Sequence, residues 1–279
     1  MNFFNKLNNL DSRIIYLFLA LVIIIPLMSP LKLPLTVSDE TKTFHGVIDK
    51  LAAGSKILIS LDYEAGSVDE LDPQVMAILR HALAKNLKIV GMSTVPEGSM
   101  FVASTLDRTY KAAGKKYGED YANLGFLAGS EAGLTAFAKD PAGTLKSDFA
   151  GTSTSSLPIM GTIKSVKDFA LTITVNNGPN IGCGPVVWVR QVATPYQEPT
   201  ILAVAAVMAP ASMPYVQAKQ LQGMISGIKG AAEYELMIDK PGMGVSIMDA
   251  QSMAHLAIVA FIILGNVGLW VMKRNPASK

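Results

Sequence analysis

Five carboxylates lie in the segment DYEAGSVDELD (62–72), and carboxylate oxygens are suitable ligands for a divalent cation. Their spacing does not match a calcium-binding loop, and Asp72 stands where it could cap a following helix. The chain has three histidines and one cysteine, which excludes a histidine-rich or a cysteine-based metal site. We therefore expect a solvated acidic loop here, with no metal and no cofactor.

Two other residues are potential nucleophiles. Ser130 in GFLAGSEAG directly follows Gly129, so the segment does not match the G-x-S-x-G pattern of hydrolases, the G-x-G-x-x-G pattern or the P-loop. A serine at the start of a helix is most often a cap. Cys183 in NIGCG would need a basic partner, and only His45 and His81 are available in the central part of the chain. The sequence therefore favours a protein that is not an enzyme.

Alternating segments of strand and helix would position these residues. Apolar runs and helical periodicity alternate about five times, which is typical of a mostly parallel sheet with helices on both faces. We expect an α/β domain, Rossmann-like or flavodoxin-like, with right-handed crossovers. The expected strands are 56–63, 87–94, 120–129, 168–177 and 199–210, and the expected helices are 72–86, 98–117, 130–140 and 216–238.

In an open parallel sheet, ligands bind beyond the carboxyl ends of the strands. Four of the five predicted loops at this edge contain glycine, as a ligand cradle would need and as ordinary turns also need. If a small molecule binds this domain, the expected contacts come from Asp62, Gly129, Ser130, Asn177 and Cys183.

Two apolar segments flank the domain, and only 16% of the residues are charged, against about 25% in an average soluble protein. Segment 14–31 carries no charge and approaches the length needed to cross a bilayer core of about 30 Å. Pro26 and Pro30 stand where a cleaved signal peptide would have small residues, so we expect an uncleaved anchor. Segment 253–272 is the second predicted transmembrane helix and ends in Lys273 and Arg274.

The flanking charges predict an orientation. Positive residues are slightly more concentrated in the two tails than beside the domain, which favours cytoplasmic termini. We therefore expect an integral protein of an inner or plasma membrane, with the central domain outside the cytoplasm. The tail residues are Lys6, Arg13, Lys273, Arg274 and Lys279, and the inner residues are Lys32, Lys42, Lys50 and Lys240. The expected organisation is a tail (1–13), a transmembrane helix (14–31), a linker (32–44), the α/β domain (45–238), a linker (239–252), a transmembrane helix (253–272) and a tail (273–279).

Asn266 interrupts the second apolar segment, close to Gly265 and Gly268. A carboxamide facing lipid leaves its hydrogen bonds unmade, so such a residue usually faces another helix, and small neighbours allow close approach. That helix could be the chain's own first span or a helix of a partner subunit, and the sequence leaves both open.

Three glycines form a second candidate interface. Gly223, Gly227 and Gly230 recur at four- and three-residue spacing within the predicted helix 216–238. Because each glycine costs about 1 kcal/mol in a helix relative to alanine, their spacing predicts a closely packed face. This face would pack against the domain's own sheet or against a neighbouring subunit.

These features favour one class of function. The net charge of +2 and the absence of a Lys/Arg stripe argue against nucleic-acid binding. We expect a non-catalytic structural or accessory subunit of a membrane complex, which contacts the lipid bilayer and either other membrane subunits or copies of itself. The alternatives are a membrane-anchored hydrolase or nucleotide-related enzyme, and a small-molecule sensor, each acting at the carboxyl edge of the sheet.

Overall fold

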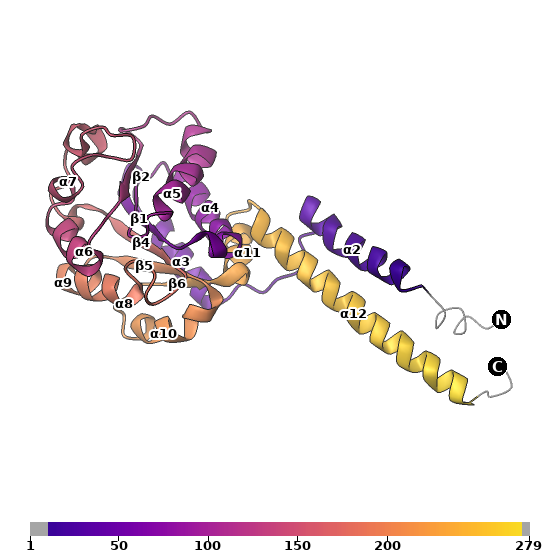
Figure 1. Cartoon of the computed structure of the whole chain (residues 1–279). Coiled ribbons are helices and arrows are strands. Elements are labelled where there is room, and N and C mark those ends of the chain that lie inside the picture. The colour runs from indigo at the N-terminus through magenta and orange to yellow at the C-terminus, as the bar shows by residue number, and fades with distance from the viewer. Residues whose placement is uncertain (1–10, 275–279) are drawn as a thin grey trace. The chain divides into compact units, whose positions relative to one another are not determined.

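The computed structural model describes residues 11–274, and the chain divides into two compact units (Figure 1). The helical unit combines Met1–Pro34 with Pro241–Lys279, and the α/β unit is Leu35–Lys240. Lys6 and Lys279, which contribute to the predicted orientation, lie outside the described residues.

The α/β unit contains one sheet of six strands, and every neighbouring pair is parallel. The strand order is β3-β2-β1-β4-β5-β6, which is the order of the Rossmann fold. The predicted α/β class is therefore confirmed, in its Rossmann-like form. The strands are β1 (Lys56–Asp62), β2 (Lys88–Ser93), β3 (Tyr121–Phe126), β4 (Leu171–Asn176), β5 (Thr200–Val204) and β6 (Met224–Ser226).

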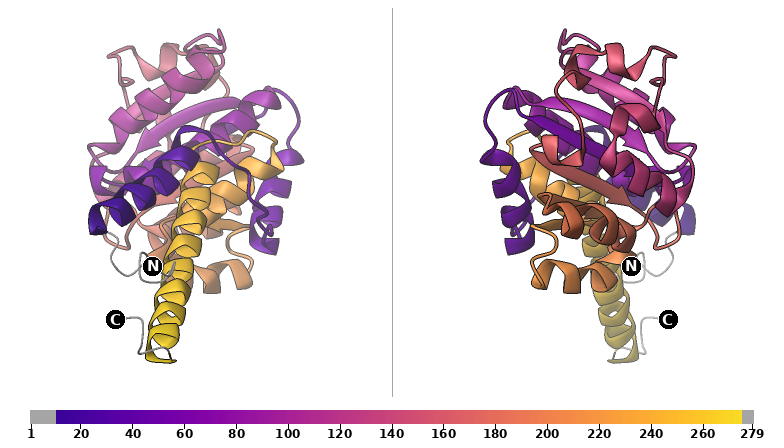
Figure 2. Two further views of the ribbon diagram at one scale, coloured as in Figure 1. Left: turned by 90° about the vertical axis from the view of Figure 1, so that its right-hand side faces the viewer. Right: turned by 90° about the vertical axis from the view of Figure 1, so that its left-hand side faces the viewer.

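Helices cover both faces of this sheet, as the two views in Figure 2 show. The strands are apolar runs rather than alternating patterns because each contributes side chains to a core on either side. In β1, Ile57 and Ile59 lie in one core and Leu58 lies in the other. The first core contains residues of α3 (Asp39–Asp49), α4 (Val68–Ala84), α5 (Gly98–Leu106) and α11 (Gly227–Met237). The second face carries α6 (Ser130–Lys139) and α8 (Pro185–Trp188), and the unit also contains α7 (Pro141–Thr144), α9 (Thr194–Tyr196) and α10 (Ala209–Gln217).

The predicted helix 216–238 is wrong in its first half. α10 ends at Gln217, β6 then pairs with β5, and α11 begins only at Gly227. A strand of three residues is too short to show a two-residue period in the sequence. Gly227 has φ +63°, a left-handed conformation that interrupts a continuous helix. The three glycines therefore do not line one face of a single helix.

Other elements also differ from the prediction; for example, β5 ends at Val204 and the expected strand 199–210 runs into α10. α4 begins at Val68, so Asp72 lies inside the helix, where its Oδ2 pairs with Arg108 Nη2 at 2.6 Å instead of capping a terminus. α3 was not predicted, and it runs from the expected linker 32–44 into the start of the expected domain. Its N-cap is Ser38, whose side chain accepts a hydrogen bond from the Thr41 amide.

The helical unit contains α2 (Ser12–Met28) and α12 (Met243–Arg274). The Met243–Trp270 part of α12 is long and apolar enough to cross a membrane, judged by length and composition alone. α2 has 17 residues, or about 26 Å at about 1.5 Å per residue, and falls short of that test. The structure thus supports one candidate span, and the second predicted span is not confirmed.

The two helices of this unit are connected by specific contacts. The rings of Phe18 and Phe261 meet edge to face, with centroids 5.6 Å apart. The buried carboxylate of Asp249 accepts hydrogen bonds from three consecutive amides, those of Leu31, Lys32 and Leu33, at 2.7, 2.9 and 3.0 Å. α12 begins ten residues before the predicted boundary at 253. Asp249 in its polar first turns holds the residues that follow α2.

Candidate functional site

The topological switch point of this sheet lies between β1 and β4, where strand order reverses. Rossmann folds bind their ligands in the crevice beyond the carboxyl ends of these two strands. Here β1 ends at Asp62 and β4 ends at Asn176, two residues that face each other in register. The sequence-predicted residues Asp62, Asn177 and Cys183 all belong to this edge.

Asp62 is fully buried and is surrounded by hydrogen-bond donors. Its Oδ1 accepts from Ser60 Oγ at 2.8 Å and from the Thr94 amide at 2.7 Å, and its Oδ2 accepts from Trp188 Nε1 at 2.8 Å. Burial raises the pKa of Asp62, and these hydrogen bonds oppose that rise. Both carboxylate oxygens are occupied by the protein's own groups.

Cys183 lies beside this carboxylate and closes the same crevice. Its amide donates to Thr94 Oγ1 at 2.7 Å, and its carbonyl accepts from Asn176 Nδ2 at 3.1 Å. Gly182 has φ +57°, and a Cβ there would lie 2.4 Å from Thr94 Oγ1, so only glycine permits this approach. Burial, with a contribution from the charge of Asp62, raises the pKa of the buried Cys183 thiol to about 12. The thiolate required of a nucleophile is therefore disfavoured.

Asn177 connects the loop after β4 to the loop after β1. Its Nδ2 donates to Ser67 Oγ at 2.8 Å. Its Oδ1 is buried and accepts no hydrogen bond within residues 11–274. Asn177 thus lies over the switch point as a bridge between the two loops.

Gly129 and Ser130 lie elsewhere on the carboxyl edge, after β3. Gly129 is the N-cap residue of α6, with φ +91°, and Ser130 follows with φ +47°. Ser130 is exposed and is the first residue of α6, so it does not act as the expected cap. No hydrogen bond within the described part of the chain connects Ser130 to the Asp62 group. The structure therefore brings together three of the five predicted ligand residues.

Carboxylates occupy the helix end where a Rossmann fold would bind phosphate. The first turn of α4 contains Asp69 and Glu70. Glu70 Oε1 accepts from the Ala206 amide at 2.7 Å, and Glu97 Oε2 accepts from the Ala65 amide at 3.0 Å. These charges repel an anionic cofactor from this helix N-terminus. No group of three or more His, Cys, Asp or Glu residues between 11 and 274 is arranged to hold a metal ion.

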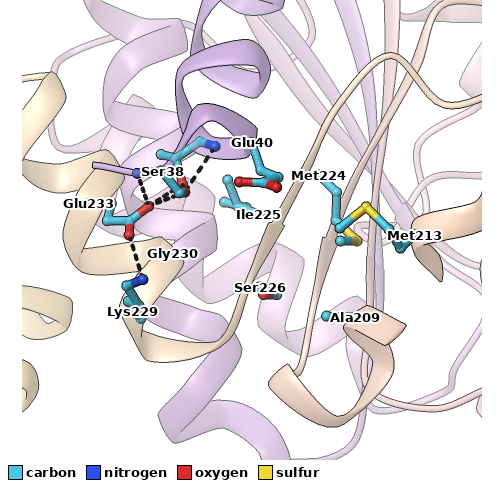
Figure 3. A pocket seen from close by; sticks show the side chains of 11 residues that line it. Ser38, Glu40, Ala209, Met213, Met224, Ile225, Ser226, Lys229, Gly230 and Glu233 are labelled. Atoms are coloured by element: carbon cyan, nitrogen blue, oxygen red, sulfur yellow. Dashed lines mark hydrogen bonds and ion pairs between the residues drawn. The ribbon is translucent and has the colours of Figure 1, made fainter. Parts of the chain in front are cut away.

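A cavity of about 190 Å³ lies beside the edge strand β6, between α3, α10 and α11 (Figure 3). Glu233 lines it and is buried, with Oε2 accepting from Ser38 Oγ at 2.5 Å and Thr41 Oγ1 at 2.6 Å. Burial acts to raise the pKa of Glu233, but these hydrogen bonds hold that pKa below its ordinary value. Lys229 Nζ lies 3.4 Å from Oε1, so this carboxylate is already paired and holds the start of α3 onto α11.

The predicted interface glycines contact the α/β unit itself. A Cβ on Gly223 would lie 3.0 Å from Phe44 Cα in α3, and one on Gly227 would lie 3.0 Å from Ala206 Cβ. A Cβ on Gly230 would lie 3.3 Å from Ile225 Cβ in β6. Contact between these glycines and another subunit stays a prediction.

Asn266 and its glycine neighbours lie on α12. Asn266 is exposed, and its Nδ2 donates to the Ile262 carbonyl of the same helix at 2.8 Å. Gly265 has open space where a Cβ would stand, and Gly268 is buried. Asp249, which sequence analysis did not identify, joins α12 to residues Leu31, Lys32 and Leu33 after α2. An acidic residue only four positions before the apolar run 253–272 was the sequence signal that could have revealed it.

Comparison with known proteins gives little further information. No protein-family model matches the chain, and no curated protein matches it. Among solved structures, the chain is similar to one described as a crystal structure analysis of the glycotransferase of kitacinnamycin, with 16% sequence identity. The match covers 74% of this chain and 45% of that chain, with a TM-score of 0.25, a value at which the likeness carries no argument about function.

Proposed function

We propose that this chain is a membrane-anchored, non-catalytic subunit of a multi-subunit membrane complex, and that its α/β unit mediates assembly. The observation that carries the proposal is the closed switch point. Trp188, Asp62, Thr94 and Cys183 bond to one another in the crevice where a Rossmann fold would hold its ligand. An enzyme that used this edge would need these groups free for its substrate.

The anchoring part of the proposal rests on α12, with α2 as a second, shorter span. Apolar side chains of both helices are exposed in the isolated chain, including Leu17 at 62% and Leu256 at 62%. Two helices make a thin bundle, so lipid or partner helices would cover these surfaces. With two spans both termini lie on one side, and the charge pattern favours cytoplasmic termini and an extracytoplasmic α/β unit.

Asn266 is the proposed contact within the membrane. Its Nδ2 bonds to its own helix, which leaves its Oδ1 for a donor on a neighbouring helix. A hydrogen bond of this kind contributes on the order of 0.6–2 kcal/mol to helix association. Gly265 beside it would let a partner backbone approach.

Native mass spectrometry of the full chain, extracted gently from its own membrane, tests this proposal. We expect a stoichiometric assembly, and we expect Asn266→Leu to weaken recovery of the partner several-fold. Val259→Leu, at another exposed position of α12, is the matched control and should leave the assembly intact. A lone chain carrying a bound small molecule would overturn the proposal and favour an enzyme or sensor.

A further inference from the structure

A larger cavity, of about 550 Å³, lies at the opposite, amino edge of the sheet. Its lining comes from the C-terminal parts of α3 and α4 and from the residues that follow α11. Helices that connect parallel strands run antiparallel to them, so these three helix ends meet at the amino edge. The volume falls within the range of about 300–1,000 Å³ that is typical of small-molecule sites.

The lining combines an apolar wall with cations. Leu83, Ala84 and Ile238 contribute apolar surface, and Arg80, Lys85 and Lys240 contribute three positive charges. Asp49 is the one carboxylate among the lining residues, and it is paired with Lys85 at 3.2 Å. Within the described residues, the side chains of Arg80 and Lys240 have no hydrogen bond or ion pair.

Two stacked histidines form the inner part of this cavity. The rings of His45 and His81 lie 4.4 Å apart with an interplanar angle of 12°. The His81 Nδ1 atom shares a hydrogen bond with the Tyr234 hydroxyl at 2.7 Å. Burial lowers the pKa of His81 to about 4 and also lowers that of His45, so both rings are neutral at pH 7. The formal charge of the lining at pH 7 is therefore three cations against one carboxylate, a balance of +2.

Helix capping does not account for the two unpaired cations. The negative ends of α3, α4 and α11 attract positive charge, which is a structural reason for basic residues here. However, the final carbonyls of α4 and α11 already accept hydrogen bonds from following amides, such as that of Leu87 to Ala82 and that of Lys240 to Glu235. The cations that remain are available to an anion that enters from solvent or from the membrane surface.

One residue of the cavity lining leads along the chain into the candidate span. Lys240 precedes the first residue of α12 by three residues, which corresponds to at most about 10 Å of extended chain. We propose that the cavity binds the phosphate group of an anionic amphiphile through Arg80 and Lys240, with the apolar part against Leu83, Ala84 and Ile238. The short connection between Lys240 and α12 favours an anionic phospholipid as the ligand. This choice rests on the proposed membrane position of α12.

The test uses the full chain in maltoside micelles and measures Tm with added phosphatidylglycerol, phosphatidylcholine or inorganic phosphate. We expect phosphatidylglycerol alone to raise Tm, by about 2–4 °C. The double variant Arg80→Gln/Lys240→Gln should lose this shift. The control Lys139→Gln/Lys146→Gln removes the same charge from exposed positions of the α/β unit and should keep it.

A second variant separates cavity binding from general attraction to anionic lipid. Ala84→Trp fills the cavity without changing its charge and should also abolish the shift. An equal rise in Tm with inorganic phosphate would show that the ligand need not be a lipid, although the phosphate-binding site would stand. A shift that persists in Arg80→Gln/Lys240→Gln would overturn the site itself. A lone chain in native mass spectrometry would contradict the assembly proposal without affecting this result.

Discussion

The two edges of the sheet differ in how they are filled. At the carboxyl edge, Asp62 accepts three hydrogen bonds, and Trp188 is fully buried above it. At the amino edge, a cavity of about 550 Å³ is lined by Arg80 and Lys240, which have no partner among the described residues. Rossmann folds usually show the reverse arrangement, with an open carboxyl edge that binds the ligand.

This difference teaches that strand order alone does not locate a site. The 3-2-1-4-5-6 order creates a crevice in the backbone, but side chains decide whether that crevice stays open. In this chain the loop after β4 folds back onto Thr94 and closes it. The open cavity lies instead at the amino edge, and its lining includes Lys240.

Among the tests of this comparison, we expect the substitution Trp188→Ala to have the largest effect. Removing a fully buried Trp leaves a cavity and takes one donor from Asp62, so we expect the free energy of unfolding to fall by about 3–5 kcal/mol. Thermal unfolding of the full chain in detergent would show a large fall in Tm. Trp270→Ala, at a residue that is 54% exposed on α12, is the control and should have little effect. A small loss for Trp188→Ala would mean that the carboxyl edge is not closed.

A second test addresses a buried acid at the amino edge. Glu198 precedes β5, and burial raises its pKa to about 8. Between about pH 4.5 and pH 8 the folded state keeps a proton that the unfolded chain releases, so stability falls as pH rises through this window. Glu198→Gln should therefore be more stable than the parent at pH 9, by at least about 1 kcal/mol, and similar at pH 4. Glu64→Gln, at an exposed position of the same unit, is the matched control. A parallel response of the two variants would contradict the assignment.

The smallest expected effect concerns the histidines of the cavity. The pKa of His81 is lowered to about 4, below its ordinary value, so the unfolded chain binds the proton more readily. Its contribution to stability is present above about pH 6.5 and is lost as pH falls toward 4. His81→Phe should remove a loss of unfolding free energy on the order of 1 kcal/mol between about pH 6.5 and pH 4, and Tm should then fall less steeply on the acid side. His255→Phe, outside the α/β unit, provides the control, and an unchanged slope in His81→Phe would show that this ring does not titrate as described.

Much of the fold could be predicted because its signals are local. Five apolar runs gave five of the six strands, and helical periodicity between them gave the parallel arrangement. β6 was missed because three residues cannot display a period, and its neighbours Gly223 and Gly227 suited a glycine-rich helix equally well. α3 was missed because most of its residues are polar, and Phe44 and Ile48 alone are its buried apolar side chains.

The site was harder to predict because it depends on contacts between distant residues. Asp62 was recognised from its place after the first strand, but Trp188, its partner, is 126 residues away in a segment of ambiguous periodicity. The amino-edge cavity joins α3, α4 and the end of α11, which share no motif. No local pattern indicates which cations will lack a partner after folding.

The Asp249 contact has a consequence for the timing of synthesis. Its carboxylate binds the amide of Leu31, and these residues are 218 positions apart, with the whole α/β unit inserted between them. At translation rates of about 5–20 residues per second, the ribosome needs on the order of 10–40 s to reach Asp249 after Leu31 has been made. During that interval the amides of Leu31, Lys32 and Leu33 lack this acceptor, while the intervening unit can already fold. The helical unit is thus the last part of the chain to be completed, although it contains the first helix.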